Sequence, residues 1–271
     1  MNYKSKGLLI KSDLSRLLKC YKIYAAIIGV SIAILFSTEQ IGLINGNILD
    51  TYIQGSELSG IMIAYVFCAF PFATVFCEDL DNKYIRYELI RSNLKRYVVT
   101  KIAFIYLTAI LVMVLGTILF LLSGRIAGGD WVNESVGCMN VLLNGSYSIL
   151  LKKEHYFLYC VMYSLQLGLL SGLLSVLAGY FSLYIHNRVT VLALPIIIYQ
   201  ILIECSGNTI YTVFIFRAYN RPMNKDWESF SLILLISIIP TILLGCLIYK
   251  KIQKRLSLIH ISEPTRRTPI S

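Results

Sequence analysis

Charged residues are scarce in this sequence. Only 15% of the 271 residues are Asp, Glu, Lys or Arg, whereas 56% are hydrophobic and the mean hydropathy is +0.67. A soluble domain of this length carries about 25% charged residues. The shortage excludes a chain that is surrounded by water on all sides. Repeated apolar runs of about 18 residues or more instead predict an all-α, polytopic membrane protein.

The sequence also lacks the motifs of common enzymes. It has 3 histidines and contains no HExxH, no G-x-S-x-G and no G-x-x-x-x-G-K-[ST], the loop that cradles nucleotide phosphates. The 7 cysteines form no CxxC or Cys/His cluster and are expected to be small packing residues. We therefore expect a chain that is not an enzyme and holds no cofactor or metal of its own.

Six apolar runs predict six transmembrane helices. They cover residues 21–37, 59–77, 102–123, 157–182, 188–204 and 228–249. A secretory signal peptide is not expected, because the first run begins only near residue 21 and no small-residue cleavage pattern follows Phe36. Residues 1–255 are thus predicted to form one membrane domain.

Basic residues are distributed unevenly around these runs. With the N-terminus inside, and with Arg266 and Arg267 of the terminal segment left aside, the cytoplasmic segments hold 17 Lys and Arg and the outer segments hold 6, while the loop 38–58 has none. Cytoplasmic loops of membrane proteins carry such an excess, which predicts that both termini are cytoplasmic. The same placement accounts for the net charge of +10, so no nucleic-acid partner is expected.

The two ends of the chain differ from the spans. Residues 10, 14, 17, 18 and 21 are apolar and share one helical stripe, with basic residues on the other faces. This pattern predicts an interfacial helix in contact with membrane lipid, and a solvated lead-in to the first span is the alternative. The segment 256–271 has no sustained period and is expected to be disordered. It resembles translated sequencing-adapter sequence, with a genuine short cytoplasmic tail as the alternative.

The densest polar stretch, residues 78–101, lies between the second and third predicted spans. Residues 82–91 combine charged side chains with aromatic and aliphatic ones at near-helical spacing. Asn93 is placed to begin a long helix at Leu94. We predict a short helix parallel to the membrane that docks a partner, because a loop without one would leave its apolar side chains wet. A solvated positive-inside loop is the alternative.

This arrangement resembles that of ABC-2-type transporter permeases. The matching features are Glu78 after the second span, a short amphipathic segment, and then Lys95, Arg96, Tyr97 and Lys101 leading into the third span. The resemblance extends over roughly residues 8–255 and includes the interfacial helix and six spans. The family often shows a Gly-Thr pair in this loop, where the present chain has Asn82 and Lys83.

The resemblance implies a bacterial cytoplasmic membrane protein that works as an ATP-driven exporter's permease subunit. The loop would be a coupling helix docking on a separate cytosolic ATPase, through Tyr84, Ile85, Tyr87, Glu88, Leu89 and Ile90. ATP and Mg²⁺ would bind that partner, and a second permease copy or a related permease would complete the pathway. A non-transporting immunity or sensor component that binds a partner through the same fold is the alternative.

Polar and small residues within the spans give further candidates. Gln166, Gln200 and Glu204 are candidates for a substrate path, since polar groups are costly inside a membrane. Interhelical hydrogen bonds, or an interfacial carboxylate for Glu204, are the alternatives. Pro71, Pro195 and Pro240 can each kink a helix, which could help a transport path open; packing alone is the alternative. The small-residue face around residues 168 and 172 is expected to allow close helix contact.

Overall fold

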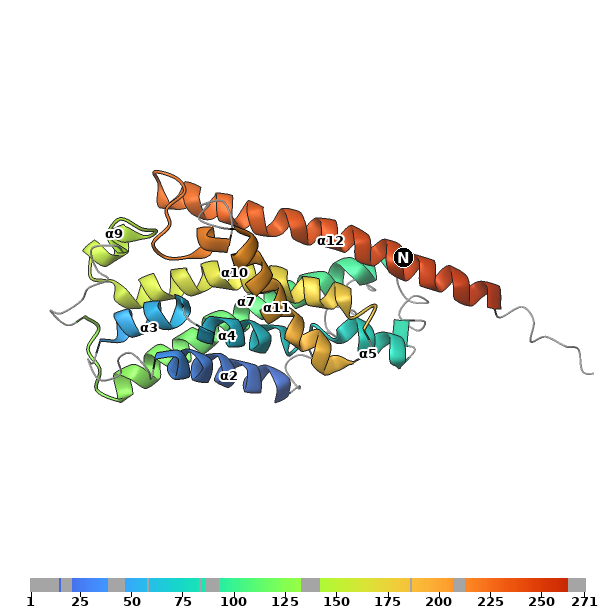
Figure 1. The fold of residues 1–271 in the computed structure, drawn as a ribbon, viewed down its shortest axis with the longest axis horizontal. Helices are drawn as coiled ribbons and strands as arrows, with labels where there is room; N and C mark the ends of the chain where they lie inside the picture. The colour runs from blue at the N-terminus through green and yellow to red at the C-terminus, as the bar shows by residue number, and fades with distance from the viewer. Residues whose placement is uncertain are drawn as a thin grey trace, which may run out of the picture.

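The computed structural model describes residues 15, 21–38, 47–57, 59–82, 84–85, 93–132, 142–185, 187–206 and 213–262 (Figure 1). Within these ranges the secondary structure is helical, and the only strand-like feature is an isolated bridge between Asn47 and Asp130. The helices are α2 (Tyr21–Thr38), α3 (Ile48–Glu57), α4 (Ser59–Ala69), α5 (Val75–Asp81), α7 (Leu94–Ile126), α9 (Ser148–Lys152), α10 (Tyr156–Phe181), α11 (Arg188–Ser206), the 3-10 helix η2 (Val213–Phe216) and α12 (Asp226–Ser262).

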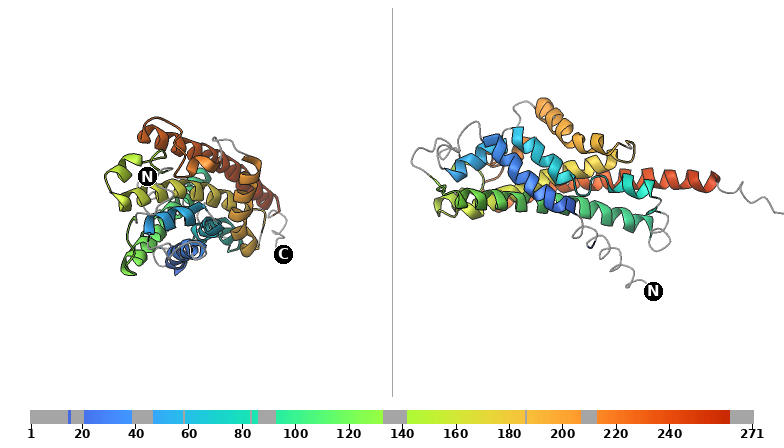
Figure 2. Two further views of the ribbon diagram at one scale, coloured as in Figure 1. Left: turned by 60° about the vertical axis from the view of Figure 1, so that its left-hand side comes forward. Right: turned by 90° about the horizontal axis from the view of Figure 1, so that it is seen from below.

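These helices form an elongated bundle with α10 at its centre. Helix α10 contacts α4, α7, α11 and α12, and α2 packs against α4 and α7. Helix α11 crosses the others obliquely, and the C-terminal half of α12 runs past the other helices (Figures 1 and 2). We call the two ends of the bundle the α5 end and the α9 end. The start of α7 and the last turns of α12 lie at the α5 end (Figure 1).

Four helices are long and apolar enough to cross a membrane, namely Leu94–Ile126, Tyr156–Phe181, Arg188–Cys205 and Asp226–Leu256. They correspond to the third to sixth predicted spans. The first predicted span is the shorter apolar helix Tyr21–Ser37. The protein is thus a helical membrane protein, and four of its six predicted spans have the necessary length.

The second predicted span, 59–77, is not one continuous helix. Helix α4 ends at Ala69, a turn covers residues 70–74, and α5 begins at Val75. Pro71 accounts for the break, because its ring clashes with the carbonyl four residues earlier and it has no N–H to donate. Pro71 therefore ends a helix, whereas Pro195 and Pro240 lie inside α11 and α12.

The predicted close contact at the small residues of α10 is confirmed. A Cβ added at Gly168 would lie 3.3 Å from the Cα of Ile110, and one at Gly172 would lie 2.7 Å from the ring of Tyr106. Both neighbours belong to α7. The two glycines therefore let α7 approach α10 more closely than residues with side chains would allow.

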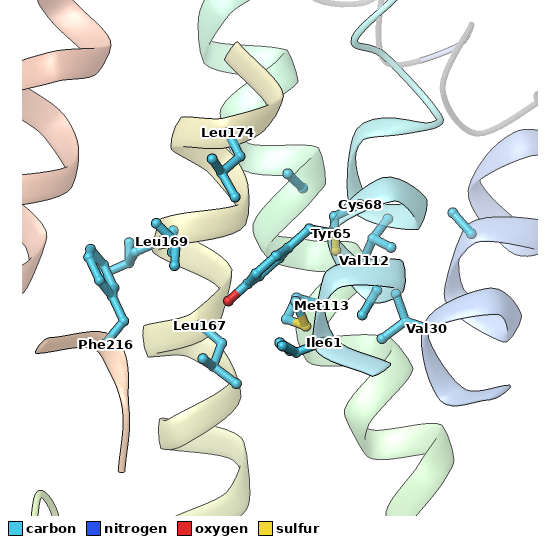
Figure 3. Packing of buried hydrophobic residues seen from close by; sticks show 14 of the residues in the cluster. Val30, Ile61, Tyr65, Cys68, Val112, Met113, Leu167, Leu169, Leu174 and Phe216 are labelled. Atoms are coloured by element: carbon cyan, nitrogen blue, oxygen red, sulfur yellow. The ribbon is translucent and has the colours of Figure 1, made fainter. Parts of the chain in front are cut away.

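The core fills the space between the helices, and Figure 3 shows part of it. The labelled side chains come from α2 (Val30), α4 (Ile61, Tyr65, Cys68), α7 (Val112, Met113), α10 (Leu167, Leu169, Leu174) and η2 (Phe216). By contrast, many apolar side chains of α7, α11 and α12 are exposed on the outside of the bundle, among them Leu111, Ile197 and Leu243. This reversal of the soluble pattern is expected where the outer surface faces lipid.

Several predictions concern the ends of elements. Helix α7 begins at Leu94 as expected, although the Asn93 side chain makes no capping hydrogen bond. Helix α12 continues to Ser262, so residues 256–262 of the segment expected to be disordered have helical backbone. The predicted loop 38–58 contains α3, most of which is buried. The interfacial helix predicted over residues 10–21 falls almost entirely outside the described residues.

Candidate functional site

The predicted docking segment leaves the bundle between α5 and α7. Of its predicted docking residues, Tyr84 and Ile85 have helical backbone, while Tyr87, Glu88, Leu89 and Ile90 lie outside the described residues. Ile85 is only 3% exposed and belongs to the core. Ile85 therefore attaches the segment to the bundle rather than contributing to an exposed docking face.

A buried ion pair joins the two sides of this segment. The Lys101 ammonium in α7 lies 3.5 Å from a carboxylate oxygen of Asp79 in α5, with side-chain exposures of 3% and 2%. The Tyr97 hydroxyl, one turn before Lys101, donates a hydrogen bond to the same oxygen of Asp79 at 2.8 Å. A carboxylate that is out of water needs such donors, because an unpaired buried charge is strongly destabilising.

A second, more exposed ion pair connects α2 to the same place. Lys22, near the start of α2, donates to Glu78 at 3.0 Å, and Thr74 donates to the same Glu78 oxygen at 3.0 Å. We call the group Lys22, Thr74, Glu78, Asp79, Tyr97 and Lys101 the charge cluster. It connects α2, α5 and α7 at the α5 end, immediately beside the polar segment.

This geometry has a mechanical consequence. The chain leaves the bundle after Asp79 and returns before Lys101, and the ion pair fixes these two points to each other. A buried ion pair adds little net stability, but it specifies register because shifting either helix separates the charges. A force applied to the segment between them would therefore reach α5 and α7 together.

The interior toward the α9 end has a different polar character. Its main members are five buried tyrosines from α3, α4, α10 and α11, namely Tyr52, Tyr65, Tyr159, Tyr163 and Tyr199, which we call the tyrosine cluster. The rings of Tyr52 and Tyr163 meet edge to face at 5.8 Å, and those of Tyr65 and Tyr199 at 5.0 Å. Tyr163 also accepts a hydrogen bond from Ser56 at 3.0 Å.

Gln166 lies beside this cluster and is fully buried. Its amide nitrogen donates to the backbone carbonyl of Ile215 in η2 at 3.1 Å. This bond holds the short helix η2 against α10. Gln166 therefore has the interhelical hydrogen bond that the sequence allows as the alternative to a place on a substrate path, which remains a prediction.

Arg217 brings positive charge to the edge of the tyrosine cluster. Its guanidinium stacks 4.7 Å from the Phe214 ring centroid and donates to the Tyr219 hydroxyl at 3.0 Å. Burial raises the pKa of Glu57, at the end of α3, and the charge of Arg217 acts in the opposite direction. An arginine and a carboxyl therefore influence each other across this part of the bundle.

Hydrogen-bonding capacity remains unused in this region. Among the described residues, no partner is found for the buried hydroxyls of Tyr52, Tyr65 and Tyr159, for Oε1 of Gln166 or for Nε of Arg217. The Tyr65 hydroxyl points at α10 between Leu167 and Leu169 (Figure 3). Unpaired buried polar atoms are costly, so they are the first groups that water or a polar ligand would satisfy if the bundle opened.

The other two predicted path residues lie elsewhere. Gln200 donates to Glu204 at 2.9 Å, and both side chains are exposed on α11. The structure thus does not bring Gln200 and Glu204 together with Gln166. The pair instead places polar groups on the outer surface of α11, where only 17% of the residues in the apolar window of the span are buried inside the bundle.

The Asp79–Lys101 ion pair, the tyrosine cluster and the position of Arg217 are not predicted from the sequence. Asp79 and Lys101 stand at opposite ends of the polar stretch 78–101, and nothing in the local sequence around either residue predicts that they meet. An acid closing one apolar run and a lysine early in the next was the available signal for the ion pair. The tyrosine cluster and Arg217 had no comparable signal, because their residues come from widely separated segments.

Comparisons with family models, curated proteins and solved structures yield no match for this chain. Its functional interpretation therefore rests on the residues and their arrangement.

Proposed function

We propose that this protein is the membrane permease subunit of an ATP-driven exporter and is coupled to a separate cytosolic ATPase. The principal observation is the buried Asp79–Lys101 pair at the base of the polar segment. A docking helix transmits a partner's movement only if it is joined firmly to the spans. The proposed docking face is Tyr84, Tyr87, Glu88, Leu89 and Ile90, with Ile85 as its anchor in the core.

The absence of a phosphate-binding loop from the sequence is consistent with this division of labour. ATP and Mg²⁺ would bind the partner, and the basic α5 end of the bundle would face the cytoplasm. Positively charged segments gather at this end, including the last turns of α12 with Lys250, Lys251, Lys254 and Arg255. The positive-inside tendency of membrane proteins supports that orientation.

The polar pair on α11 supports a second permease copy. Gln200 and Glu204 are exposed on a helix of membrane-spanning length, where contact with lipid tails is costly. A second copy, or a related permease, would cover the pair and enclose a pathway with polar groups on its wall. The substrate path proposed here thus runs along α11 between two subunits.

Co-purification tests the proposal most directly. The tagged protein is extracted from its native membranes in mild detergent, and bound proteins are identified by mass spectrometry. We expect a phosphate-loop ATPase to co-purify with the parent protein. The double variant Tyr87→Asp/Leu89→Asp should retain at least about tenfold less of it, because the two introduced carboxylates would be buried in the interface with the ATPase. The matched control Ile149→Asp/Trp227→Asp changes two exposed apolar residues at the α9 end and should retain the ATPase.

Two results would contradict the proposal. An intact membrane complex without any ATPase would favour the alternative, a non-transporting immunity or sensor component. Equal loss of the ATPase from both double variants would show that the docking surface is not specific to the polar segment. If the ATPase binds as expected, ATP-dependent accumulation of amphipathic dyes and peptides in inverted vesicles separates transport from binding alone.

A further inference from the structure

A long apolar groove runs along the outside of the bundle between α7 and α12. Its volume is about 910 Å³. The α7 wall extends from Val98 to Leu107 and includes Ala103, and the α12 wall extends from Ile238 to Tyr249 and includes Cys246. The floor is closed toward α10, where the Tyr106 hydroxyl contacts Ser237 at 2.7 Å and Ser237 donates to the carbonyl of Leu169.

The groove is charged at one end only. Lys95 in the first turn of α7 and Lys250 in α12 line the end nearest the basic surface, together with Gln253, and none of the lining residues is acidic. The described part of the chain offers neither ammonium a carboxylate within ion-pair distance. The opposite end, between Leu107 and Ile238, is lined by apolar side chains.

Neighbouring basic residues show that this arrangement is selective. Lys101 pairs with Asp79, Lys251 lies 4.0 Å from the ring centroid of Tyr184, and Arg255 donates to the carbonyl of Leu183. These three cations interact within the chain. Lys95 and Lys250, on the groove side of the same two helices, have no such partner among the described residues.

The length of the groove matches one lipid leaflet. From Lys95 to Leu107 the rise along α7 is roughly 18 Å at about 1.5 Å per residue. Half of a hydrocarbon core of about 30 Å is about 15 Å. A molecule with an anionic head at the lysines would therefore have room for an acyl chain along the apolar walls.

We propose that the α7–α12 groove is a binding site for an anionic phospholipid of the leaflet at the α5 end. The phosphate would lie between Lys95 and Lys250, and one acyl chain would follow the walls toward Leu107 and Ile238. Lysines at the surface of a membrane attract anionic lipid headgroups, and neutral lipids of the same chain length do not gain this attraction. This site is independent of the exporter proposal.

Charge argues against other occupants of the groove. A second copy that met this face in two-fold symmetry would bring its own Lys95 and Lys250 to the same membrane level, where like charges repel. The N-terminal segment is also basic, with Lys4, Lys6, Lys11, Arg16 and Lys19. An anionic lipid complements the two lysines, whereas either of these protein segments would add positive charge.

Native mass spectrometry of the full-length protein in detergent tests the site. The probes are phosphatidylglycerol and phosphatidylcholine with the same acyl chains. We expect the parent to bind phosphatidylglycerol about tenfold more tightly, given the attraction of each lysine for an anionic surface. Lys95→Gln/Lys250→Gln should abolish that preference. The matched control Lys251→Gln/Lys254→Gln removes the same charge from the same end and should keep the preference within about twofold.

A second pair of measurements tests the acyl-chain channel. Ala103→Phe fills the groove without changing charge and should reduce retention of both lipids about fivefold. If that variant misfolds, the alternative is peptide-resolved maleimide labelling of exposed Cys246 in the parent. Phosphatidylglycerol should slow this labelling more than an equal concentration of phosphatidylcholine.

Three outcomes would overturn the proposal. The first is an unchanged preference for phosphatidylglycerol in Lys95→Gln/Lys250→Gln. The second is an equal loss of that preference in the control Lys251→Gln/Lys254→Gln. The third is a lipid-free dimer that the same two substitutions dissociate or strengthen, which would make the groove an interface between copies. Thermal unfolding of every variant confirms that the folded state is being compared.

Discussion

Two polar pairs in the helical bundle have opposite surroundings in this protein. Asp79 and Lys101 are nearly inaccessible and join α5 to α7, whereas Gln200 donates a hydrogen bond to Glu204, one turn away, on the outside of α11. The charges of the first pair neutralise each other inside the subunit. The second pair forms one hydrogen bond along its own helix but still exposes polar atoms on a surface that is otherwise apolar and suited to lipid.

The difference separates internal structure from candidate interfaces. A buried charge without its partner is strongly destabilising, so the Asp79–Lys101 pair belongs to the architecture of the subunit. A polar pair on the outer face contributes little to folding and acquires its importance when another molecule covers it. Substitutions that distinguish these two roles also test the proposed coupling at the α5 end and the proposed pathway along α11.

The largest effect is expected from Lys101→Met. It leaves the Asp79 carboxylate buried without its cation, which should lower the free energy of unfolding by about 3–5 kcal/mol. Denaturant unfolding in detergent measures this loss. Adding Asp79→Leu should recover most of it, because a well-packed apolar pair replaces the charges. Lys22→Met, which removes the more exposed ion pair, should cost about 1 kcal/mol or less. A loss below about 1 kcal/mol for Lys101→Met would refute the structural role of the pair.

A smaller effect is expected from Tyr97→Phe. The substitution removes the hydroxyl that donates to Asp79 and should cost about 1.5–3 kcal/mol, typical of hydrogen bonds to a charged group. Tyr159→Phe is the matched comparison, since that buried hydroxyl lacks a partner among the described residues. It should be neutral or slightly stabilising. Equal costs for the two variants would show that ring packing, and not the hydrogen bond, determines the result at position 97.

The smallest effect on stability is expected from Gln200→Leu/Glu204→Leu. The unfolding free energy of the isolated subunit should change by no more than about 0.5 kcal/mol, as for other exposed positions. Self-association in detergent, measured by sedimentation, should weaken about tenfold if a second copy covers the pair. Ser231→Leu, at an exposed position of α12, serves as the control. Unchanged association would place this face of α11 against lipid, and a loss above about 1 kcal/mol would mean that the pair supports the subunit itself.

Local chemistry made parts of the fold predictable. The third to sixth spans follow from apolar runs, and the start of α7 at Leu94 follows from the residues around it. The close approach of α7 and α10 follows from Gly168 and Gly172. The interruption at Pro71 was also present in the sequence, but the high hydropathy on both sides favoured one continuous span.

The candidate sites were less predictable because they join distant segments. Ile85 was assigned to the docking face from its position in an amphipathic segment, yet it is buried. Gln166, Gln200 and Glu204 have similar apolar neighbours in sequence, but only Gln166 turns inward. The side of a helix that faces the bundle depends on which helices surround it, and α11 has few neighbours.

The sequence by itself determined that this is a helical membrane protein, since only long apolar helices satisfy their backbone hydrogen bonds within lipid. It also determined where positive charge collects. Only the tertiary structure decided that Asp79 meets Lys101, that the tyrosine cluster forms, and that Lys95 and Lys250 line one groove. The reason is physical: hydropathy and charge act locally along the chain, whereas ion pairs and grooves arise from packing between helices that are distant in sequence.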